Sequence, residues 1–546
     1  MNFTKKLFLQ IIKYKEEIIY MFSKSPNVEH LSAAEKKLYF TNKEKWKPLD
    51  NNKQSDYILI EGLLSSYGPN YLYRTGLITK AVQAKFPQLT PIVLYTSLMH
   101  LNIRATVIYK SFGIDVFVST ANSLINQFLK FYAKFKAYFA AKQINDGESL
   151  LDFHFGGIHL GDLIYDNIIS SLKTYKTIDE IKPDMKPFIS QAVYEVIIFN
   201  RLFKKYKPKF YISTHPCYIT YGVLCRLALR YNCRVILTTD IEVIELHKNL
   251  DPNVKWTPVF HEFVGNYIKE KLKLVQDENK LIEESKSYLE NRIKGKIDQV
   301  DIQLAYSSKT EYEENFLRKQ LELTENKPIV FIFAHIIADA PHTSHFLLFK
   351  DYFVWLKETL KICAEIKDVY WLVKPHPAAK VYSEIGLVEK LVTDLNMTHI
   401  KIVPNDFNTN SAIKYAHALL TINGTAGLEF SCFGVPVILA GKPFYSGHGI
   451  CLEPRSMDEY IKMLNSIKDI NKLSTTQIQM ALKVLAIFNG YSISNNKVLT
   501  SDLLMKVWGY KDRDLEFVFN QMAKNLEEID PKTEPQYLRA IEIVNQ

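Results

Sequence analysis

Short apolar segments alternate with longer amphipathic segments through most of the chain. In the first 240 residues the apolar segments are five to nine residues long and end at polar or turn residues. Such runs are typical of buried parallel strands. We expect strands at 57–65, 91–98, 114–119, 210–214 and 234–239, with helices at 71–85 and 217–231. Strands that alternate with helices indicate βαβ units and a parallel sheet.

The same alternation resumes near residue 328. Here the pattern predicts strands at 328–335, 369–377, 400–404, 418–423 and 436–441, separated by helices at 350–366, 383–396, 409–417 and 425–433. This spacing predicts a second compact, Rossmann-like sheet. A stretch rich in lysine and glutamate at 268–325 separates the two regions and reads as exposed helices.

We therefore predict an α/β protein with two Rossmann-like domains that face a cleft. The expected units are an N-terminal α/β domain with helical extensions (1–325), a C-terminal Rossmann-like domain (326–500) and C-terminal helices (501–546). A chain of 546 residues is too long for one hydrophobic core, which agrees with this division.

Composition narrows the setting of the protein. A net charge of +9 is compatible with an anionic partner but selects none, and no nucleic-acid motif accompanies it. The six cysteines include no C-x-x-C pair and are expected to be reduced core residues. No apolar stretch reaches the roughly 18–20 residues that span a bilayer. The N-terminus is interrupted by charges and predicts an amphipathic helix, so we expect a cytoplasmic protein.

The segment 418–449 carries the sharpest chemical signal. A strand ends at Asn423, and Gly424-Thr425 turns the chain into a helix. A helix start presents free N–H groups to a phosphate, and Thr425 can cap the helix or offer its hydroxyl to the anion. Glu429 lies one turn further on, where it could reach a ribose hydroxyl. An ordinary capped helix is an equally good interpretation of the glycine and threonine alone.

Lys374-Pro375-His376-Pro377 follows another expected strand of the same sheet. Ligands of open α/β sheets bind outside the carboxyl ends of the strands. His376 is held between two prolines, which suits a rigidly placed hydrogen-bond donor to a phosphate. A single histidine after a strand is more often a loop residue, but both segments end strands of one sheet and can meet at one rim.

These two segments, KPHP and NGTAGLEFSCFGVPVILAGKPFY, resemble the donor half of bacterial capsule and lipopolysaccharide glycosyltransferases of the GT-B type. The resemblance is strongest to capsule enzymes that use CMP-activated acidic sugars, such as β-Kdo transferases, and more distant to polysialyltransferases. It covers about 325–450. It implies that His376 and Thr425 bind the nucleotide phosphate, with Lys374, Asn423 and Gly424 beside them, and that Glu429 holds the ribose.

Candidate catalytic residues lie in both halves. His335, Asp339 and His342 follow the first strand of the second sheet, where a loop would line the cleft. In the first half, a glycine-rich segment at 156–166 contains Asp162, our first choice of catalytic carboxylate, and Asp240 is the second choice. A polar loop or helix cap is the competing interpretation of each.

A catalytic metal is not expected. The only D-x-D sequence, at 512–514, lies in a charged helical region and not after a strand. The expected reaction is therefore metal-independent and needs no cofactor beyond the nucleotide-sugar donor.

Residues 124–142 carry four lysines, no acid and a stripe of Phe131, Phe135 and Phe139. Core packing with the lysines in water is the favoured interpretation. A helix that rests on the anionic inner face of the cytoplasmic membrane is the alternative, which allows peripheral association.

The predicted function is a glycosyltransferase of bacterial capsule or lipopolysaccharide synthesis. It would move a sugar from CMP-Kdo or a similar CMP-activated acidic sugar to a glycan or lipid-linked glycan. A UDP- or GDP-sugar transferase, a sugar-nucleotide epimerase and a non-catalytic capsule assembly subunit remain alternatives.

Overall fold

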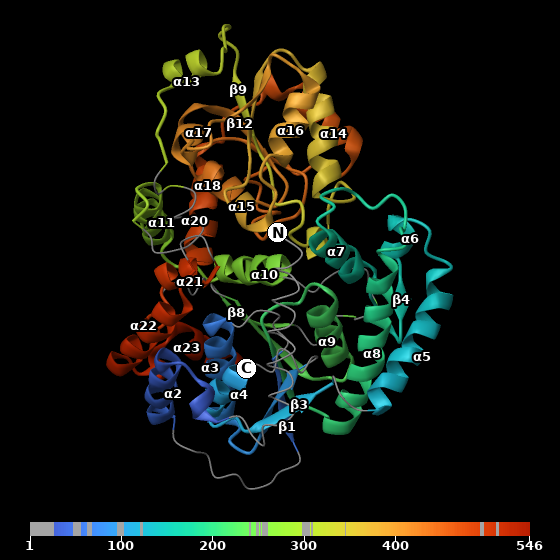
Figure 1. Cartoon of the computed structure of the whole chain (residues 1–546). Helices are drawn as coiled ribbons and strands as arrows, with labels where there is room; N and C mark the ends of the chain where they lie inside the picture. Colours follow the sequence, from blue (N-terminus) through green and yellow to red (C-terminus); the bar gives the residue numbers. More distant parts are fainter. Residues whose placement is uncertain are drawn as a thin grey trace.

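The computed structural model of the chain contains two large, mainly parallel sheets with helices on their faces (Figure 1). It describes residues 27–46, 56–62, 68–95, 103–120, 124–239, 242–246, 251, 253, 260–296, 306, 309–343, 346–491, 496–508 and 513–546.

The first sheet has six strands in the order β3-β2-β1-β6-β7-β8. The strands are β1 (Tyr57–Glu61), β2 (Thr90–Tyr95), β3 (Val116–Ser119), β6 (Phe210–Ser213), β7 (Arg234–Thr238) and β8 (Val243–Leu246). All pair in parallel except β8, which runs antiparallel to β7. The first five strands confirm the positions expected from the sequence, whereas β8 was not predicted.

The second sheet has five parallel strands in the order β11-β10-β9-β12-β13. They are β9 (Ile329–Phe333), β10 (Tyr370–Lys374), β11 (Ile400–Ile402), β12 (Ala416–Thr421) and β13 (Val437–Leu439). Counted along the chain, both sheets follow the strand order 3-2-1-4-5 of the classic Rossmann fold. This confirms the predicted α/β fold with two Rossmann-like units.

Helices cover both faces of each sheet, so alternate strand residues face different cores. On one face of the first sheet, Ile58, Ile60 and Ile212 belong to a core shared with helices from both ends of the chain. Those helices are α2 (Ala33–Lys45), α3 (Pro69–Lys85), α4 (Ile103–Lys110), α21 (Ser501–Trp508), α22 (Leu515–Glu528) and α23 (Pro535–Asn545).

The opposite face of the first sheet contributes to a core that continues beneath the second sheet. Its helices include α5 (Leu124–Ala141), α6 (Gly147–Leu151), α7 (Gly161–Leu172), α8 (Lys186–Tyr206), α9 (Ile219–Arg230), α10 (Phe260–Lys273), α11 (Glu278–Ile293), α13 (Glu314–Gln320), α17 (Thr409–Tyr415), α18 (Ala426–Cys432) and α20 (Thr475–Tyr491). Helix α10 crosses between the two sheets in Figure 1. The far face of the second sheet packs on α14 (Tyr352–Glu365), α16 (Leu387–Leu395) and α19 (Met457–Asn465), with the short α15 (Ala379–Tyr382) beyond β10.

Two sequence expectations need correction. The glycine-rich segment at 156–166, read as a loop, is a tight hairpin of β4 (His154–Phe155) and β5 (Ile158–His159) that leads into α7. Gly156 and Gly157 form its turn with φ of 63° and 77°, a conformation that glycine adopts without strain. The aromatic stripe of α5, read as core, is exposed.

Candidate functional site

Three neighbouring strand ends of the second sheet carry the residues singled out in the sequence. Strand β9 lies between β10 and β12, and all three run parallel. His335 follows β9, the Lys374–His376 segment ends β10, and Asn423–Thr425 follow β12. The expected rim therefore exists, with His335 at its centre.

Direct contacts join these strand ends. The ring centres of His335 and His376 are 5.9 Å apart, and His335 lies 4.4 Å from the ring of Tyr352. The Tyr352 hydroxyl is 3.5 Å from the Asn423 side-chain nitrogen. Tyr352, buried at the start of α14, thus links the central histidine to the β12 end of the rim.

His376 is set up to donate a hydrogen bond as a neutral ring. Its Nδ1 accepts a 3.1 Å bond from the backbone N–H of Ala378. Burial, together with His335 and Lys374, lowers the pKa of His376 to about 3. With Nδ1 acting as acceptor, the proton of the neutral ring is on Nε2, where it can be donated to a ligand oxygen.

Lys374 is a buried cation beneath the rim. Its ammonium lies 5.1 Å over the Phe333 ring. Burial and the positive charge of Lys309 lower the pKa of Lys374 to about 8, against the effect of Glu429. An anion at this rim would compensate the buried charge.

Two side chains hold the backbone of the turn after β12 in place. The Gly424 carbonyl accepts a hydrogen bond from the Tyr445 hydroxyl, and the Gly424 N–H donates to Thr421 Oγ1 over 3.3 Å. Thr425 immediately precedes α18, is exposed and makes no side-chain cap, contrary to the capping role suggested by the sequence.

Glu429 is held by residues that precede the second sheet. Its carboxylate accepts 2.6 Å hydrogen bonds from Arg292 Nη2 and from the Tyr306 hydroxyl. Both Glu429 and Arg292 are buried. These contacts fix the carboxylate and tie the end of α11 to α18; the ribose-binding role of Glu429 stays a prediction.

A cavity of about 340 Å³ lies where the two sheets meet. This volume is within the usual range for small-molecule sites, about 300–1,000 Å³. One wall comes from the second sheet and the other from the first sheet, α10 and α21. The lining residues are Tyr71, His215, Cys217, Tyr218, His261, His335, Asp339, Ala340, Tyr352, Tyr382 and Trp508.

The cavity joins the switch points of both sheets. In open α/β sheets, ligands bind where the strand order reverses, which is between β9 and β12 here and between β1 and β6 in the first sheet. His335 follows β9 and His215 follows β6, and both line the cavity. Tyr218 and Ala340 also line it, with φ of 62° and 41°. Such backbone conformations are costly for these residues and gather at functional sites.

Asp339 and His335 are the predicted catalytic residues that reach this cavity. Burial raises the pKa of Asp339 and lowers that of His335, although the two groups partly offset each other's shifts. The Tyr382 hydroxyl donates to Asp339 Oδ1 over 3.2 Å. A carboxyl with a raised pKa beside an imidazole is a combination that can transfer protons.

His342 makes a different contact from the one expected. Its Nδ1 lies 2.5 Å from Asp166 Oδ1, and its backbone N–H donates to Asp166 Oδ2 over 3.2 Å. Burial opposes protonation of His342, but Asp166 outweighs this and raises the pKa of His342. This pair connects the loop after β9 to α7, and so joins the two halves.

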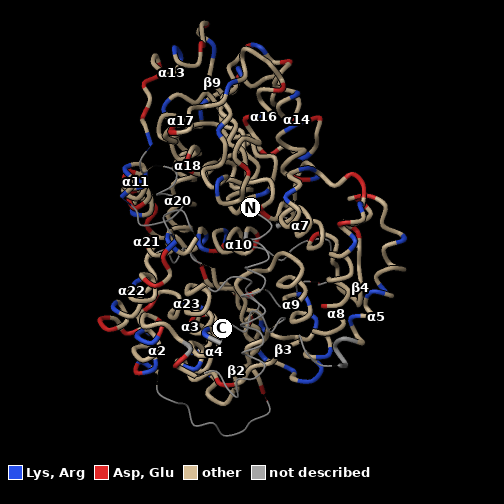
Figure 2. Tube along the Cα trace, in the orientation of Figure 1, with Lys and Arg blue, Asp and Glu red and all other residues tan. Residues whose placement is uncertain are grey.

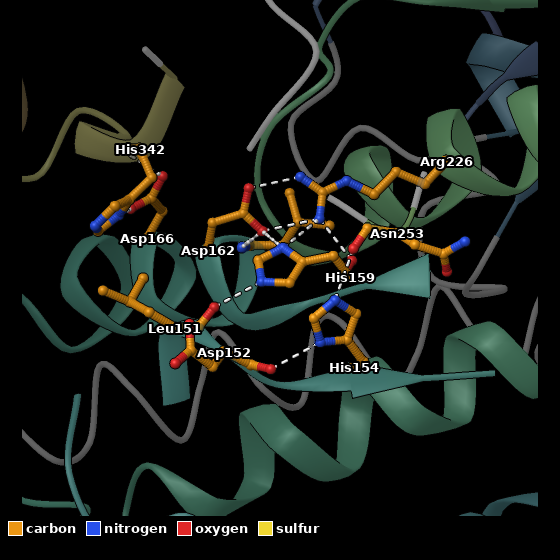
Figure 3. A network of polar contacts seen from close by, with 10 residues as sticks. Leu151, Asp152, His154, His159, Asp162, Asp166, Arg226, Asn253 and His342 are labelled. Atoms are coloured by element: carbon orange, nitrogen blue, oxygen red, sulfur yellow. Dashed lines mark hydrogen bonds and ion pairs between the residues drawn. The ribbon is translucent and has the colours of Figure 1, made fainter. Parts of the chain in front are cut away.

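Asp162 lies in a buried ion pair (Figure 3). Arg226 donates to both of its oxygens, at 2.8 and 2.5 Å, and His159 Nδ1 is 3.1 Å away. Although burial raises the pKa of Asp162, Arg226 and His159 hold it well below its usual range. Both oxygens are engaged inside the protein and Asp162 does not line the cavity, so the structure separates it from the His335 rim.

The remaining sequence candidates are placed as follows. Asp240 lies outside the described residues, as does Asp512 of the D-x-D sequence; Asp514 caps α22 through the N–H of Phe517. Among the described residues no group of three or more histidine, cysteine or acidic side chains could hold a metal ion. The six cysteines, all within the described ranges, are free thiols as expected.

Sequence reasoning missed the aromatic wall of the cavity. Tyr71, Tyr382 and Trp508 come from α3, α15 and α21, which are distant in the sequence. Tyr218 was the one aromatic with a usable signal, because it comes shortly after strand β6 in the same segment as His215. Aromatic residues are frequent in this chain, so their identity alone indicates nothing.

A known protein family matches part of the chain, mostly in its second half. Residues 287–487 match the family model for capsule polysaccharide biosynthesis proteins. The match confirms the resemblance for that region, which holds the whole rim from His335 to Glu429. No curated protein matches the chain.

Several solved structures are similar at low identity. The β-Kdo 2,4-transferase of Thermosulfurimonas dismutans KpsC is 13% identical, with 51% of this chain and 79% of that chain covered and a TM-score of 0.33. The β-Kdo 2,7-transferase of the same KpsC is 14% identical, with 63% of this chain and 94% of that chain covered and a TM-score of 0.32. The UDP-GlcNAc 2-epimerase of Neisseria meningitidis is 10% identical, with 84% of this chain and 100% of that chain covered and a TM-score of 0.25. TM-scores this low do not discriminate between these proteins, and the fold assignment rests on the two sheets.

Within the described part of the chain, no helix is both long and apolar enough to cross a bilayer.

Proposed function

We propose that the protein is a nucleotide-sugar-dependent glycosyltransferase of capsule or lipopolysaccharide synthesis. The observation that carries this proposal is the cavity where the switch points of two Rossmann-like sheets meet, with His335 on one side and His215 on the other. The family match of residues 287–487 supplies the polysaccharide context. A site between two such sheets can hold a donor on one wall and an acceptor on the other.

In this proposal the second sheet binds the donor. The neutral His376 donates from Nε2 to a phosphate oxygen, and Lys374 supplies positive charge below it. Thr425 and the N–H groups of the turn after β12 complete the phosphate site, and Glu429 accepts from a ribose hydroxyl. Hydrogen-bond donors that point at the phosphate stabilise the negative charge that develops on the leaving nucleotide, so they lower the barrier to sugar transfer.

His335 and Asp339 are the proposed proton-transfer pair, because they line the cavity beside His376. Ionised Asp339 accepts the proton of the acceptor hydroxyl while that oxygen bonds to the anomeric carbon of the donor sugar, and the bond from this carbon to the nucleotide phosphate breaks. Tyr382 holds the carboxyl of Asp339 in place. Asp162 is the less suitable carboxylate because Arg226 already binds both of its oxygens. We retain CMP-Kdo, or a similar CMP-activated acidic sugar, as the proposed donor on the strength of the family resemblance, and we propose that transfer needs no metal ion.

The first experiment is a thermal-shift panel with CMP, CDP, UDP, GDP and their sugars. A ligand at 100 times its dissociation constant adds about 2.7 kcal/mol to the free energy of unfolding, which is readily measured. The panel is run on the wild type, on His376→Ala and on His154→Ala as a matched control. His154 is an exposed histidine of the β4–β5 hairpin that does not line the cavity.

We expect CMP and CMP-Kdo to stabilise the wild type and His154→Ala but not His376→Ala. Stabilisation by UDP or GDP instead would discard the CMP donor and keep the transferase. Formation of a new nucleotide sugar without an acceptor would identify an epimerase. If no nucleotide stabilises the protein, the transferase proposal fails and a non-catalytic assembly role takes its place.

A further inference from the structure

Helix α5 exposes its aromatic side chains and buries two of its alanines. Six of its aromatic residues are between 40% and 72% exposed: Phe128, Phe131, Tyr132, Phe135, Tyr138 and Phe139. By contrast, Ala133 and Ala137 are at most 1% exposed, and this side of the helix packs on α8. A surface helix normally does the reverse, with its apolar stripe toward the core and polar residues in water. Core packing therefore does not explain this aromatic stripe.

The exposed aromatic residues form one continuous face. Their positions follow the three- and four-residue spacing of a single helical face, opposite Ala133 and Ala137. The rings also touch: Phe135 and Phe139 are 4.8 Å apart, and Tyr138 and Phe139 are 5.5 Å apart. Soluble monomers rarely expose contiguous apolar patches of this kind unless they serve as interaction sites.

Positive charge surrounds this face. Residues 124–142 contain Lys130, Lys134, Lys136 and Lys142 and no acidic residue. Lys136 lies 5.5 Å from the Tyr132 ring centre, and Lys142 lies 4.9 Å from that of Tyr138. The ammonium groups of Lys136 and Lys142 therefore lie against the aromatic surface, and Lys130 and Lys134 add exposed positive charge on the same helix. We call this surface, formed by the six aromatic residues and four lysines, the α5 face.

The α5 face is also placed where a large flat partner can reach it. In Figure 1, α5 is the outermost helix on its side of the molecule, with α8 between it and the first sheet. Figure 2 shows the basic residues of this region at the periphery. The cavity between the sheets is lined by other elements and remains separate from it.

We propose that the α5 face docks the protein onto the surface of an anionic lipid bilayer. Aromatic rings on an amphipathic helix enter the boundary between headgroups and acyl chains, and flanking lysines bind anionic headgroups. The lysines favour this occupant over a second copy of the chain, because paired α5 faces would bring like charges together. The same lysines distinguish the face from a generic apolar patch. This proposal is independent of the donor nucleotide.

The test is co-sedimentation of the full chain with vesicles. One set is pure phosphatidylcholine, and the other contains about 30% phosphatidylglycerol, an anionic lipid. We expect the wild type to bind the anionic vesicles at least about tenfold more tightly, since each lysine near such a surface contributes about fivefold. Raising NaCl from about 0.05 M to 0.5 M should weaken binding, because salt screens exposed charges.

Two variants separate the aromatic and the charge contributions. The triple variant Phe131→Ser, Phe135→Ser, Phe139→Ser should lose at least about tenfold in vesicle affinity, because inserted rings leave water. The variant Lys130→Gln, Lys134→Gln, Lys136→Gln should lose the preference for anionic vesicles. The matched control Phe40→Ser, Phe316→Ser removes two rings that are 53% and 60% exposed elsewhere and should bind as the wild type does.

A further variant does not depend on removing the apolar face. Phe135→Trp keeps an aromatic ring, and brominated lipids should quench its added fluorescence if this position enters the bilayer. Equal vesicle binding by the wild type and the triple serine variant would overturn the proposal, as would an unquenched Trp at position 135. A third result would also overturn the proposal. In it, the wild type binds no vesicles, and light scattering shows a dimeric wild type but a monomeric triple variant.

Discussion

At the scale of single residues, Lys374 ties the proposed donor site to pH. Its pKa is lowered to about 8, mainly by burial, so the free protein carries this charge at pH 7 and loses it above pH 8. A phosphate monoester, with a second pKa of about 6, is almost fully ionised above pH 7 and changes little over this range. We expect nucleotide affinity to fall above pH 8, approaching tenfold per pH unit, when measured by calorimetry between about pH 7 and 9.5.

The variant Lys374→Met should bind nucleotide more weakly at pH 7 and lose this pH dependence. The exposed Lys390, which pairs with Asp394 on α16, provides the control Lys390→Met. An unchanged pH profile in Lys374→Met would show that another group holds the phosphate.

The Asp162–Arg226 pair offers a test that separates structure from chemistry. Both side chains are at most 2% exposed, so removal of one leaves the other as an uncompensated buried charge. We expect Asp162→Ala to lower the free energy of unfolding by about 3–5 kcal/mol, measured by denaturant titration. The double variant Asp162→Ala, Arg226→Met should be less destabilised than the sum of the single variants.

The sign of the pH effect follows from the lowered pKa of Asp162. A carboxyl with a depressed folded pKa stabilises the protein above its unfolded pKa, about 3.9, and this contribution is lost as the pH falls through the folded value. Stability that declines less in acid for Asp162→Ala than for the wild type is the expected result. If the variant were fully stable but inactive, Asp162 would be catalytic as the sequence suggested.

At the scale of elements, Asp351 joins the start of α14 to the first half of the molecule. Its carboxylate accepts from the backbone N–H of Val354 at 2.9 Å, from the Tyr165 hydroxyl at 2.9 Å and from the Thr177 hydroxyl at 3.1 Å. The variant Asp351→Ala removes a helix cap and leaves the buried Tyr165 hydroxyl without the acceptor for its proton, although that hydroxyl still accepts from the N–H of Ile178. We expect a loss of about 2–4 kcal/mol in the free energy of unfolding.

Asp514 is the matched control for this loss. It caps α22 in the same way, through the N–H of Phe517, but its side chain is exposed. Asp514→Ala should therefore cost only about 1 kcal/mol by thermal or denaturant unfolding. Equal losses in the two variants would mean that the bonds from Tyr165 and Thr177 contribute nothing.

The strands were predictable because their burial is legible in the sequence. Segments such as 57–60 and 329–333 are short, continuous apolar runs, which are typical of strands covered on both faces. Strand β8 is not evident from the sequence because it has only four residues and pairs antiparallel at the edge of the sheet, so its apolar run is too short to stand out. The exposure of the aromatic face of α5 could not be predicted. Periodicity shows that the aromatic residues share one face of the helix, but it does not show whether that face packs on the core or lies in solvent.

The site was predictable only in part. Lys374 ends a strand of the second sheet, and His376 and Thr425 come shortly after strands of the same parallel sheet, so the sequence alone predicts a shared rim. The opposite wall depends on how the two sheets approach each other, and no local pattern encodes that approach. Trp508 illustrates the limit: it lines the cavity from α21, far along the chain from Tyr71, which it contacts at 5.5 Å between ring centres.

At the scale of the whole molecule, the two ends of the chain belong to one structural unit. Helices α21, α22 and α23 follow the second sheet in sequence, yet their buried residues share a core with β1 and α3 of the first sheet. The far face of the second sheet has its own core, built on Trp355 and Trp371. The chain therefore returns to complete the first half, and in doing so places Trp508 in the cavity.

This arrangement predicts how local stability is coupled. Phe519 of α22 is 1% exposed in the core shared by both chain ends, and Leu464 of α19 is fully buried in the core of the second sheet. Truncation of either side chain to alanine should cost about 2–5 kcal/mol. In native-state hydrogen exchange, Phe519→Ala should reduce protection of α3 and β1 along with α22, while β10 keeps its protection. Leu464→Ala should do the opposite. If Phe519→Ala affected α21–α23 alone, the C-terminal helices would be an independent appendage, and Trp508 could not be a fixed part of the cavity wall.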